Sequence, residues 1–359
     1  MAGRLGRVHP VLPARLAVLL YGLGAEVLFQ ELSSTLLGTL SRLLKRGPSR
    51  PLKEAKPQRT QRAQRRERKK REKERPSMSF RLHPGARIGV VALVVADLRR
   101  SLDYYTQRIG LEVLGQEGHT ASLGVGALEL LRLQEQPGAK PAPRRNAGLY
   151  HFALLTPSRP ALGETLRHLI ETRTPLDGAS DHGVSEALYL SDPDGHGIEI
   201  YRDRPRAEWP FVQGKLGMTL DPLDAEGILA AAENGAWHGM AAGTFIGHIH
   251  LHVAQIAAAE AFYTGALGMD LMQRFPGQAS FLSAGGYHHH VGVNVWAGVG
   301  APPPPEDAAR LLWYELRLPD EASLAALLAN LEAQGIATEA HARGVLVRDP
   351  AQNAIVLRS

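Results

Sequence analysis

Two short runs between Gly148 and Tyr201 carry side chains that could do chemistry. His151 lies in GLYHFALL and Glu199 lies in IEIY, and both runs are rich in residues that favour strands. Because side chains alternate along a strand, the isoleucines of IEIY take one face and Glu199 takes the other. The Asp-Pro-Asp-Gly sequence before this run has the residues of a turn, which sets where the strand begins. The pattern therefore predicts a histidine and an inward-facing carboxylate on one sheet.

The amino-acid composition limits the chemistry further. The chain has no cysteine, which excludes disulfides, zinc–thiolate sites and thiol nucleophiles. Any metal must then be held by histidine and carboxylate ligands. With 359 residues, 44% of them hydrophobic, the chain is long enough for two or three domains with cores of their own.

Charge is distributed unevenly along the chain. Residues 1–77 hold 19 Lys and Arg against 6 Asp and Glu, whereas residues 78–359 hold 22 against 30. The apolar run Leu16–Phe29 is too short for a spanning helix, and residues 46–75 have almost nothing to bury, which predicts disorder. This basic extension could bind nucleic acid or a membrane. The preferred interpretation is a dispensable segment, with Met78 opening the folded part.

An internal repeat begins after Met78. The sequence IGVVALVV starts at Ile88 and IGHIHLHV starts at Ile246, an offset of 158 residues that also matches Tyr105 with Tyr263. A similar unit begins again halfway through each repeat. Repetition of this kind governs the fold, because each unit is one supersecondary motif. The predicted strand–helix–strands modules lie at about 86–140, 147–204, 244–300 and 310–359.

The modules resemble the βαβββ units of the vicinal oxygen chelate (VOC) superfamily, which includes glyoxalase I, bleomycin resistance proteins and type I extradiol dioxygenases. GLYHFALL, SDHGVSEALYLSDPDGHGIEIY, GHIHLHV and SAGGYHHHVGVN are similar to the bacterial two-domain catechol 2,3-dioxygenase group. The resemblance implies an α+β fold in which four βαβββ modules form two VOC domains with cupped mixed sheets. The expected divisions are a basic, largely disordered extension at 1–77, domains at 86–204 and 244–359, and a linker at 205–243.

In that family, paired modules form a cup whose first and last strands carry the metal ligands. Matching the repeats aligns three pairs of positions: His248 with Val90, Glu199 with Val356, and His151 with Glu315. A pair made of the first and second modules then lacks a full set of metal ligands. A pair made of the third and fourth modules lacks one as well. Pairing the second with the third joins His151, Glu199 and His248, a two-histidine, one-carboxylate set that suits Fe(II), with Mn(II) as an alternative.

The resemblance also implies groups for proton transfer. In this family a histidine lies just before the strand that carries the glutamate ligand, and a tyrosine follows that histidine. In this chain the corresponding residues are His182 and Tyr189. The structural alternatives are that His182 caps the preceding turn and that Tyr189 only packs its ring in the sheet. His250 and His252 share the face of His248, so that one of them could support the ligands.

The histidine triplet at 288–290 supplies the fourth position of the cup. Strand alternation puts His288 and His290 on one face and His289 on the other. Aligning the glycines that precede the strands places His290 opposite Glu199. There it would be an acid/base group or a fourth metal ligand, and the acid/base role is preferred. The structural alternative is that the triplet is a solvated strand edge.

By this resemblance the protein is an Fe(II)-dependent extradiol dioxygenase that cleaves catechol or a substituted catechol in aromatic catabolism. One rival is a glyoxalase-like metal-dependent lyase or isomerase, for which only Glu315 could add a second carboxylate. The other is a non-catalytic ligand-sequestering protein, which should lack the three ligands. The expected partners are a small aromatic diol and O2, with no nucleic acid for the folded part and no membrane. A homo-oligomer is left open, and a cytoplasmic location is expected.

The first prediction is that the basic extension is dispensable. A protein that begins at Met78 should keep its fold and its catechol turnover, because the module pattern is intact from about residue 86 onward. Circular dichroism and a turnover assay on both lengths check this. An insoluble or inactive short form beside an active full chain would show that the extension belongs to the enzyme.

Overall fold

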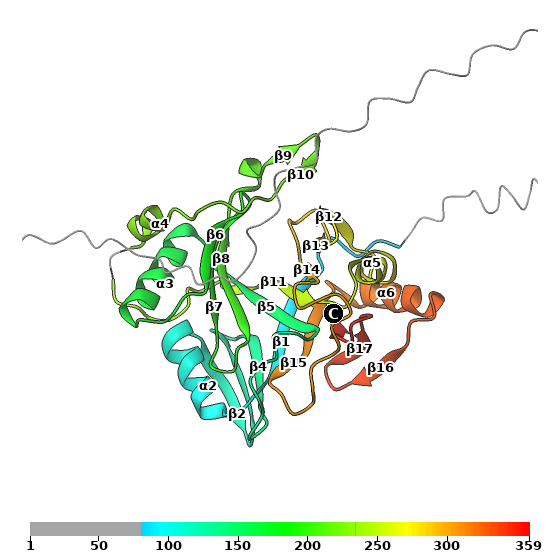
Figure 1. Cartoon of the computed structure of the whole chain (residues 1–359), viewed down its shortest axis with the longest axis horizontal. Coiled ribbons are helices and arrows are strands. Elements are labelled where there is room, and N and C mark those ends of the chain that lie inside the picture. The colour runs from blue at the N-terminus through cyan, green and yellow to red at the C-terminus, as the bar shows by residue number, and fades with distance from the viewer. Residues whose placement is uncertain (1–79, 234) are drawn as a thin grey trace, which may run out of the picture. The chain divides into compact units, whose positions relative to one another are not determined.

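The computed structural model describes residues 80–233 and 235–359, and in this part the chain forms four consecutive βαβββ modules (Figure 1). The four predicted modules and the α+β fold class are thereby confirmed. The predicted basic extension at 1–77 lies outside the described residues. Among the helices that the structure describes, none has the length and apolar character needed to cross a membrane.

The modules repeat the same order of elements. The first contains β1 (Arg87–Val95), α2 (Leu98–Tyr104), β2 (Glu112–Glu117), β3 (Thr120–Val125) and β4 (Leu128–Glu135). The second contains β5 (Gly148–Leu155), α3 (Arg159–Glu171), β6 (Gly178–Asp181), β7 (Ser185–Ser191) and β8 (Gly197–Asp203). The third contains β11 (Phe245–His252), α5 (Ile256–Ala261), β12 (Asp270–Phe275), β13 (Ala279–Ser283) and β14 (Val291–Asn294). The fourth contains β15 (Arg310–Arg317), α6 (Glu321–Ala333), β16 (Thr338–His341), β17 (Gly344–Arg348) and β18 (Ala354–Arg358).

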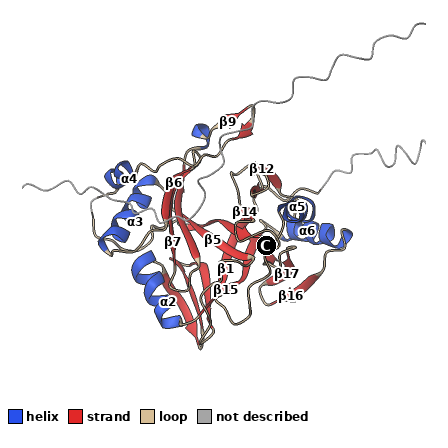
Figure 2. Cartoon of the chain, in the orientation of Figure 1, coloured by secondary structure: helices blue, strands red, loops and turns tan. Residues whose placement is uncertain are grey.

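The segment between the second and third modules is irregular, as expected for a linker. It contains the short hairpin β9 (Phe211–Val212) and β10 (Lys215–Leu216), followed by the helix α4 (Ala225–Ala231). Two helices of the modules continue into single turns of π-helix, α2 into η1 (Tyr105–Ile109) and α5 into η3 (Phe262–Ala266). Helices lie at the periphery and strands between them (Figure 2).

The modules pair through two mixed eight-stranded sheets. One sheet has the order β16-β17-β18-β15-β1-β4-β3-β2 and the other has the order β12-β13-β14-β11-β5-β8-β7-β6. Each sheet is joined at its centre by an antiparallel pair, β1 with β15 and β5 with β11. The first module thus shares a sheet with the fourth, and the second with the third, which confirms the pairing deduced from the ligand positions.

The sheets do not follow the expected domain division at 86–204 and 244–359. Each sheet takes half its strands from either side of the linker. The helices instead join modules that are consecutive in the chain, because Arg108 donates to the carbonyl of Thr172 at 2.8 Å and Asn330 donates to the carbonyl of Ala266 at 2.8 Å. As a statement about domains, the division stays a prediction.

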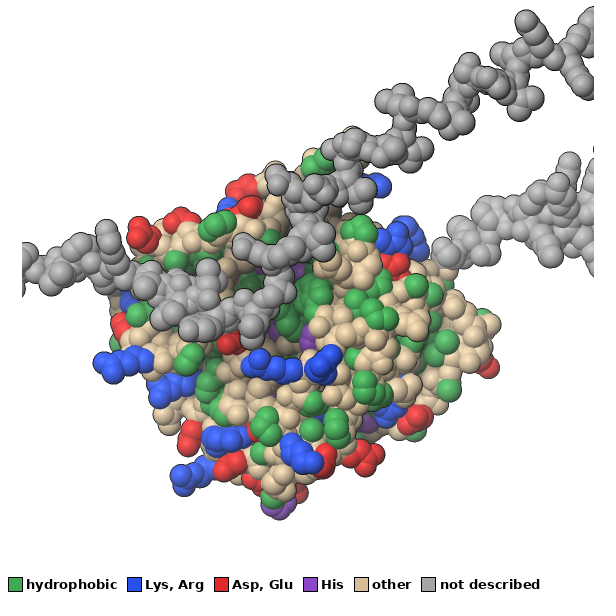
Figure 3. All heavy atoms as spheres, in the orientation of Figure 1, with side chains coloured by type: hydrophobic (Ala, Val, Ile, Leu, Met, Phe, Trp, Pro, Cys, Tyr) green, Lys and Arg blue, Asp and Glu red, His purple; other side chains and the backbone are tan. Residues whose placement is uncertain are grey.

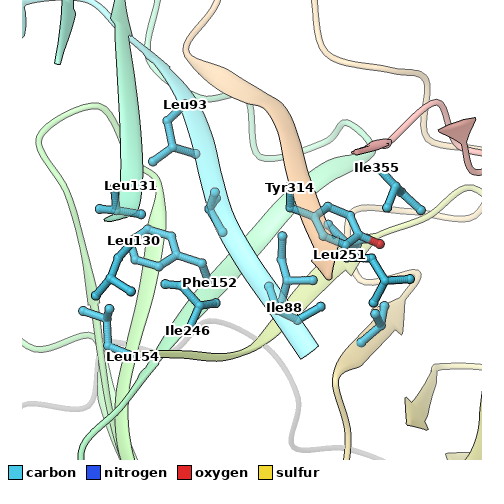
Figure 4. Packing of buried hydrophobic residues seen from close by; sticks show 14 of the residues in the cluster. Ile88, Leu93, Leu130, Leu131, Phe152, Leu154, Ile246, Leu251, Tyr314 and Ile355 are labelled. Atoms are coloured by element: carbon cyan, nitrogen blue, oxygen red, sulfur yellow. The ribbon is translucent and has the colours of Figure 1, made fainter. Parts of the chain in front are cut away.

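Alternation along the strands separates a core face from a cup face in each sheet. On β5, Phe152 and Leu154 are fully buried in one hydrophobic cluster that also contains Leu93 of β1 and Ile246 of β11. Figure 4 shows these side chains between strands of both sheets. Burial of such side chains contributes about 1.5–3 kcal/mol each, so the two core faces are held together by the hydrophobic effect. The opposite faces are left to line the two cups.

The strand register corrects one alignment made from the sequence. Glu199 pairs with Ala153 on β5, and the corresponding Val356 pairs with Glu315 on β15. Glu315 therefore occupies the place of Ala153, and Trp313 occupies the place of His151. The motifs around the two residues look alike, but the register of a strand is set by its partners and not by local sequence similarity.

The cup of the first sheet has ion pairs where the second sheet has its histidines. Glu315 is fully buried and binds Arg343 at 2.7 Å and Arg317 at 2.8 Å, and it also accepts the backbone N–H of Val90 at 3.2 Å. Burial would raise the pKa of Glu315, but the two arginines hold it below its ordinary value. This carboxylate is committed to arginines and so offers no second carboxylate to the other cup.

Gly247 on β11 allows a close approach of two strands. A β-bulge leaves Gly247 as the extra residue between the pairs Ile246–Leu154 and His248–Ala153. A Cβ atom at Gly247 would lie 1.9 Å from the hydroxyl oxygen of Tyr201, which is fully buried. Only glycine fits without moving the ring or the strand.

Gly247→Ala should destabilise the fold by roughly 1–3 kcal/mol, because the added carbon overpacks a buried contact. Urea unfolding measures the change in the free energy of unfolding. Gly115→Ala is the matched control, since a Cβ there meets no atom within 4 Å. Equal stability of the two variants would contradict the close approach.

Candidate metal centre

Three buried side chains of the second sheet converge on one point. His151 on β5, Glu199 on β8 and His248 on β11 are 5%, 3% and 1% exposed. The Oε2 of Glu199 lies 3.0 Å from the Nε2 of His151 and 3.1 Å from the Nε2 of His248. One possible ligand atom from each residue lies within 4.8 Å of the others. The structure thus brings together the three residues named from the sequence, although 49 positions separate Glu199 from His248.

The chemistry of this cluster fits a metal ion. Two atoms bound to one ion at about 2.1 Å and at right angles are about 3.0 Å apart, close to the spacing found here. Buried polar atoms normally have hydrogen-bond partners. In the described residues, the Nε2 of His151, which faces Glu199, is a buried atom without a hydrogen-bond partner. A cation between the two histidines and the carboxylate would satisfy this lone pair.

The electrostatics favour the protonation states that bind metals. Burial alone would raise the pKa of Glu199, but His248 and His151 hold it well below its ordinary value. Burial lowers the pKa of His151, against the pull of the same carboxylate. At neutral pH the cluster therefore offers an ionised carboxylate and a neutral imidazole, the forms that can donate lone pairs.

His182 and Tyr189 form a hydrogen-bonded pair beside the cluster. The Nε2 of His182 lies 2.6 Å from the hydroxyl of Tyr189, and its Nδ1 lies 2.9 Å from the carbonyl oxygen of Thr219. A carbonyl can only accept, so the Nδ1 carries the proton and the Nε2 accepts from Tyr189. The ring of Tyr189 lies 5.6 Å from that of His151, between centroids. Burial, followed by Glu199, raises the pKa of Tyr189 well above its ordinary value.

The contact with Thr219 comes from the linker and was missed by the sequence analysis. The backbone N–H of Thr219 also donates to the carbonyl of His182 at 2.9 Å, and Asp181 pairs with Asp221 next to it. On its other side, the linker is held by Gln273, whose side-chain oxygen accepts the N–H of Met218 at 2.7 Å. The irregular, polar composition of this segment carries no signal for such a contact.

The histidine triplet differs from the expected arrangement. The strand β14 begins only at Val291, so the alternation assumed through residues 288–290 was wrong. His290 turns to Ser283, with its Nδ1 3.0 Å from the hydroxyl oxygen, and burial lowers its pKa to about 4. The ring beside the cluster is that of His289, whose centroid lies 4.1 Å from the centroid of His248. A turn that precedes a strand does not follow the strand's alternation, which explains the error.

His288 is buried behind His289 and connects it to a carboxylate. The Nδ1 atoms of the two rings are 2.8 Å apart, and the Nε2 of His288 lies 2.9 Å from Asp203. The hydroxyl of Tyr287 also donates to Asp203 at 3.2 Å and lies 2.7 Å from that of Tyr201. This network supports the wall of the cup formed by β8.

The side chains of the cup are visible from one face of the molecule. Figure 3 shows histidine and hydrophobic side chains gathered near the middle of that face. Buried apolar neighbours, among them Ala153 and Ala187, lie with Tyr201 in a small cluster, and Ala153 pairs with both Glu199 and His248. The site therefore combines a polar centre with apolar walls, as small-molecule sites do.

Comparison with known proteins identifies the family of the repeated modules. The sequence model of the Glyoxalase/Bleomycin resistance protein/Dioxygenase superfamily matches residues 87–200 and 245–357. A catechol-2,3-dioxygenase of Bacillus subtilis (strain 168) is 43% identical over 279 residues, which cover 77% of this chain and 98% of that protein. Both repeats found in the sequence therefore fall within the matched residues.

Two solved structures are similar to this chain at low sequence identity. A candidate dioxygenase from Bacillus subtilis subsp. subtilis str. 168 superimposes with a TM-score of 0.56 at 12% identity, covering 77% of this chain and 86% of that one. Glyoxalase I from Zea mays gives a TM-score of 0.48 at 16% identity, covering 76% and 92%. The first of these similarities supports the arrangement of modules described above.

The tyrosines predict an unusual alkaline titration, because most of them are buried. Full or partial removal from water raises the pKa of all eight tyrosines in the described residues: Tyr104, Tyr105, Tyr150, Tyr189, Tyr201, Tyr263, Tyr287 and Tyr314. Because the folded state holds these protons more tightly, their contribution to stability is complete below the ordinary pKa of about 10 and is lost as pH rises beyond it.

Ultraviolet absorbance of phenolate should show little ionisation of the native protein near pH 10, whereas the protein in guanidinium chloride should titrate at about that pH. Stability measured by denaturant unfolding should fall over the same alkaline range. Half-ionisation of the tyrosines at about pH 10 in protein that is still folded would contradict their burial.

Proposed function

The chain belongs to the Glyoxalase/Bleomycin resistance protein/Dioxygenase superfamily, and we propose that within it the protein is an Fe(II)-dependent extradiol dioxygenase acting on catechol or a substituted catechol. The observation that carries the proposal is the buried cluster of His151, Glu199 and His248 next to the hydrogen-bonded pair His182–Tyr189. The relative named catechol-2,3-dioxygenase, 43% identical over nearly its whole length, supports the same reaction.

In this proposal the two histidines and the glutamate hold the metal on one side. A set of two histidines and one carboxylate leaves positions free for other ligands and suits Fe(II), with Mn(II) as the alternative. Iron held there would supply the redox chemistry that joins O2 to a catechol chelated through its two oxygens. The absence of cysteine in the sequence removes the thiolate ligands that favour zinc.

The residues around the cluster would move the protons. Because the Tyr189 hydroxyl donates to the Nε2 of His182, the phenol oxygen keeps lone pairs that can accept from a substrate hydroxyl. A proton taken from the substrate could then pass along the pair. His289, with its unpaired Nε2 beside His248, is a second group that can accept or return a proton, and it takes the role expected of His290.

The two rival functions find less support in the site. A glyoxalase-like lyase or isomerase would use a second carboxylate, and the candidate, Glu315, is bound to arginines in the other cup. A ligand-sequestering protein needs no cluster of buried metal-binding side chains. A small aromatic diol and O2 remain the proposed partners, while the cytoplasmic location and the oligomeric state stay open to measurement.

Reconstitution with Fe(II) under anaerobic conditions, followed by catechol and air, should give a yellow ring-fission product. Replacing His151, Glu199 or His248 by Ala should abolish stoichiometric iron binding, because each supplies one of three ligands. His182→Ala and Tyr189→Phe should keep the iron and lower kcat by roughly 10²–10⁴-fold, the usual contribution of general acid/base groups. Elemental analysis and turnover assays separate the two classes of variant.

Val90→Ala is the matched control, because Val90 holds the position of His248 in the first sheet, where it is buried without a ligand role. It should affect stability and leave the iron content unchanged. Full turnover after chelation of all metal would refute both metal-dependent functions, the dioxygenase and the glyoxalase-like lyase or isomerase. Production of an isomerised or lyase product without O2 would favour the glyoxalase-like alternative.

A further inference from the structure

Two large aromatic side chains beside the metal cluster are exposed. Tyr150 is 39% exposed and Trp296, which follows β14, is 48% exposed. Their ring centroids are 5.2 Å apart in an edge-to-face arrangement. Tyr150 also lies 4.9 Å from the ring of His151, one of the three converging residues. We call Tyr150 and Trp296 together the aromatic ledge.

The backbone turns Tyr150 toward the cup. On β5, Phe152 and Leu154 face the core, so simple alternation would send Tyr150 there as well. The register instead pairs His151 with His250 and Leu149 with Leu251, which leaves Tyr150 as the extra residue of a β-bulge. Bulges of this kind redirect side chains and are frequent next to active sites.

The ledge is held in place by a fixed set of contacts. The side chain of Asn294 donates to the Nε2 of His250 at 3.0 Å, and its oxygen accepts from the Nδ1 of His252 at 2.6 Å and from the backbone N–H of Trp296 at 3.0 Å. The rings of His250 and His252 in turn lie 5.2 and 5.0 Å from that of Tyr150. The exposed faces are therefore positioned before any ligand arrives.

The ledge consists of a phenol and an indole, which carry no formal charge. Behind it, the hydrogen bond that the Asn294 amide donates to the Nε2 of His250 requires the neutral ring of that histidine. A charged substituent placed on these rings would lose water without gaining an opposite charge.

Resting on the proposed function, we infer that the aromatic ledge is a specificity subsite that holds an apolar substituent of the catechol, so that alkyl- and aryl-substituted catechols are preferred over carboxylated ones. A row of side chains runs outward from the cluster in the order Glu199, His151, Tyr150, Trp296. The carboxylate of Glu199 lies 3.0 Å from the Nε2 of His151, and the ring centroids of His151 and Tyr150 and of Tyr150 and Trp296 are 4.9 and 5.2 Å apart. A ring whose oxygens reach the cluster would direct a substituent onto the ledge. Aromatic faces bind such groups through burial and edge-to-face contacts.

The pair His182–Tyr189 is unsuited to the same role. The two side chains are hydrogen-bonded to one another and to the linker, and Tyr189 is packed against the small apolar cluster around Tyr201. This pair offers hydrogen-bonding groups for substrate hydroxyls. The ledge offers hydrophobic surface, and the pair and the ledge together would orient an asymmetric catechol.

The test uses the full chain loaded with Fe(II). The kcat/KM of catechol, of 3- and 4-phenylcatechol and of 3,4-dihydroxybenzoate is measured for the wild type, Trp296→Ala and Tyr150→Ala. The wild type should favour the better phenylcatechol over the carboxylated compound by roughly 10-fold or more, and each variant should lose roughly 10-fold or more of this preference. The loss for catechol itself should be smaller than the loss for the phenylcatechols, because catechol has no substituent to place.

Binding without turnover gives a second readout. Under anaerobic conditions, calorimetric titration should show weaker binding of the phenylcatechols to Trp296→Ala, and Trp296→Phe should restore the affinity, because it restores an aromatic face. Phe211→Ala is the matched control: Phe211 is 51% exposed and lies on the linker hairpin. It should leave the preference unchanged.

The outcomes separate the two proposals. If the wild type cleaves catechol but the ledge variants lose all substrates equally, or lose none, the subsite is refuted while the dioxygenase function stands. A wild-type preference for the carboxylated compound would likewise refute the subsite. If iron-loaded wild type neither binds nor cleaves any catechol, the proposed function fails and the subsite fails with it.

Discussion

The antiparallel pairing of β5 with β11 is the interaction on which the site depends. It joins two modules that are separated by the linker, and it places His151 and His248 on adjacent strands. The pairing is stabilised mainly on the opposite face, where Phe152 and Ile246 are buried in the shared core. A site of buried polar groups can exist here because its scaffold is fixed by apolar contacts that take no part in the chemistry.

Repetition in the sequence made most of this arrangement predictable. A constant offset between repeats gives the modules, and the positions where ligands are missing show that the second module must pair with the third. The wrong predictions concern the positions of two single residues. Glu315 was matched to His151, although the register places it opposite Val356, and His290 was taken for a strand residue, although β14 starts at Val291. Both errors concern register and turns, which depend on partners that are distant in the sequence.

Other features had no signal in the sequence. Contact between His182 and the linker depends on where an irregular segment crosses the cup, and the bulge at Tyr150 depends on how β5 meets β11. Neither follows from propensity or alternation, since both arise from tertiary contacts. Functional residues are often found where local rules fail, because a side chain that must reach a ligand is often one that regular structure would send elsewhere.

The two cups solve the same electrostatic problem in different ways. A buried carboxylate is costly unless it is paired. In the first cup Glu315 has arginine partners within the chain, so its charge is neutralised without any ligand. In the second cup Glu199 meets two histidines, of which burial tends to keep His151 neutral, and the Nε2 of His151 and the Nδ1 of His248 lack hydrogen-bond partners within the described residues. One cup is therefore complete as a structural element, whereas the other keeps its buried carboxylate between two histidines, an arrangement whose charge a bound cation would balance.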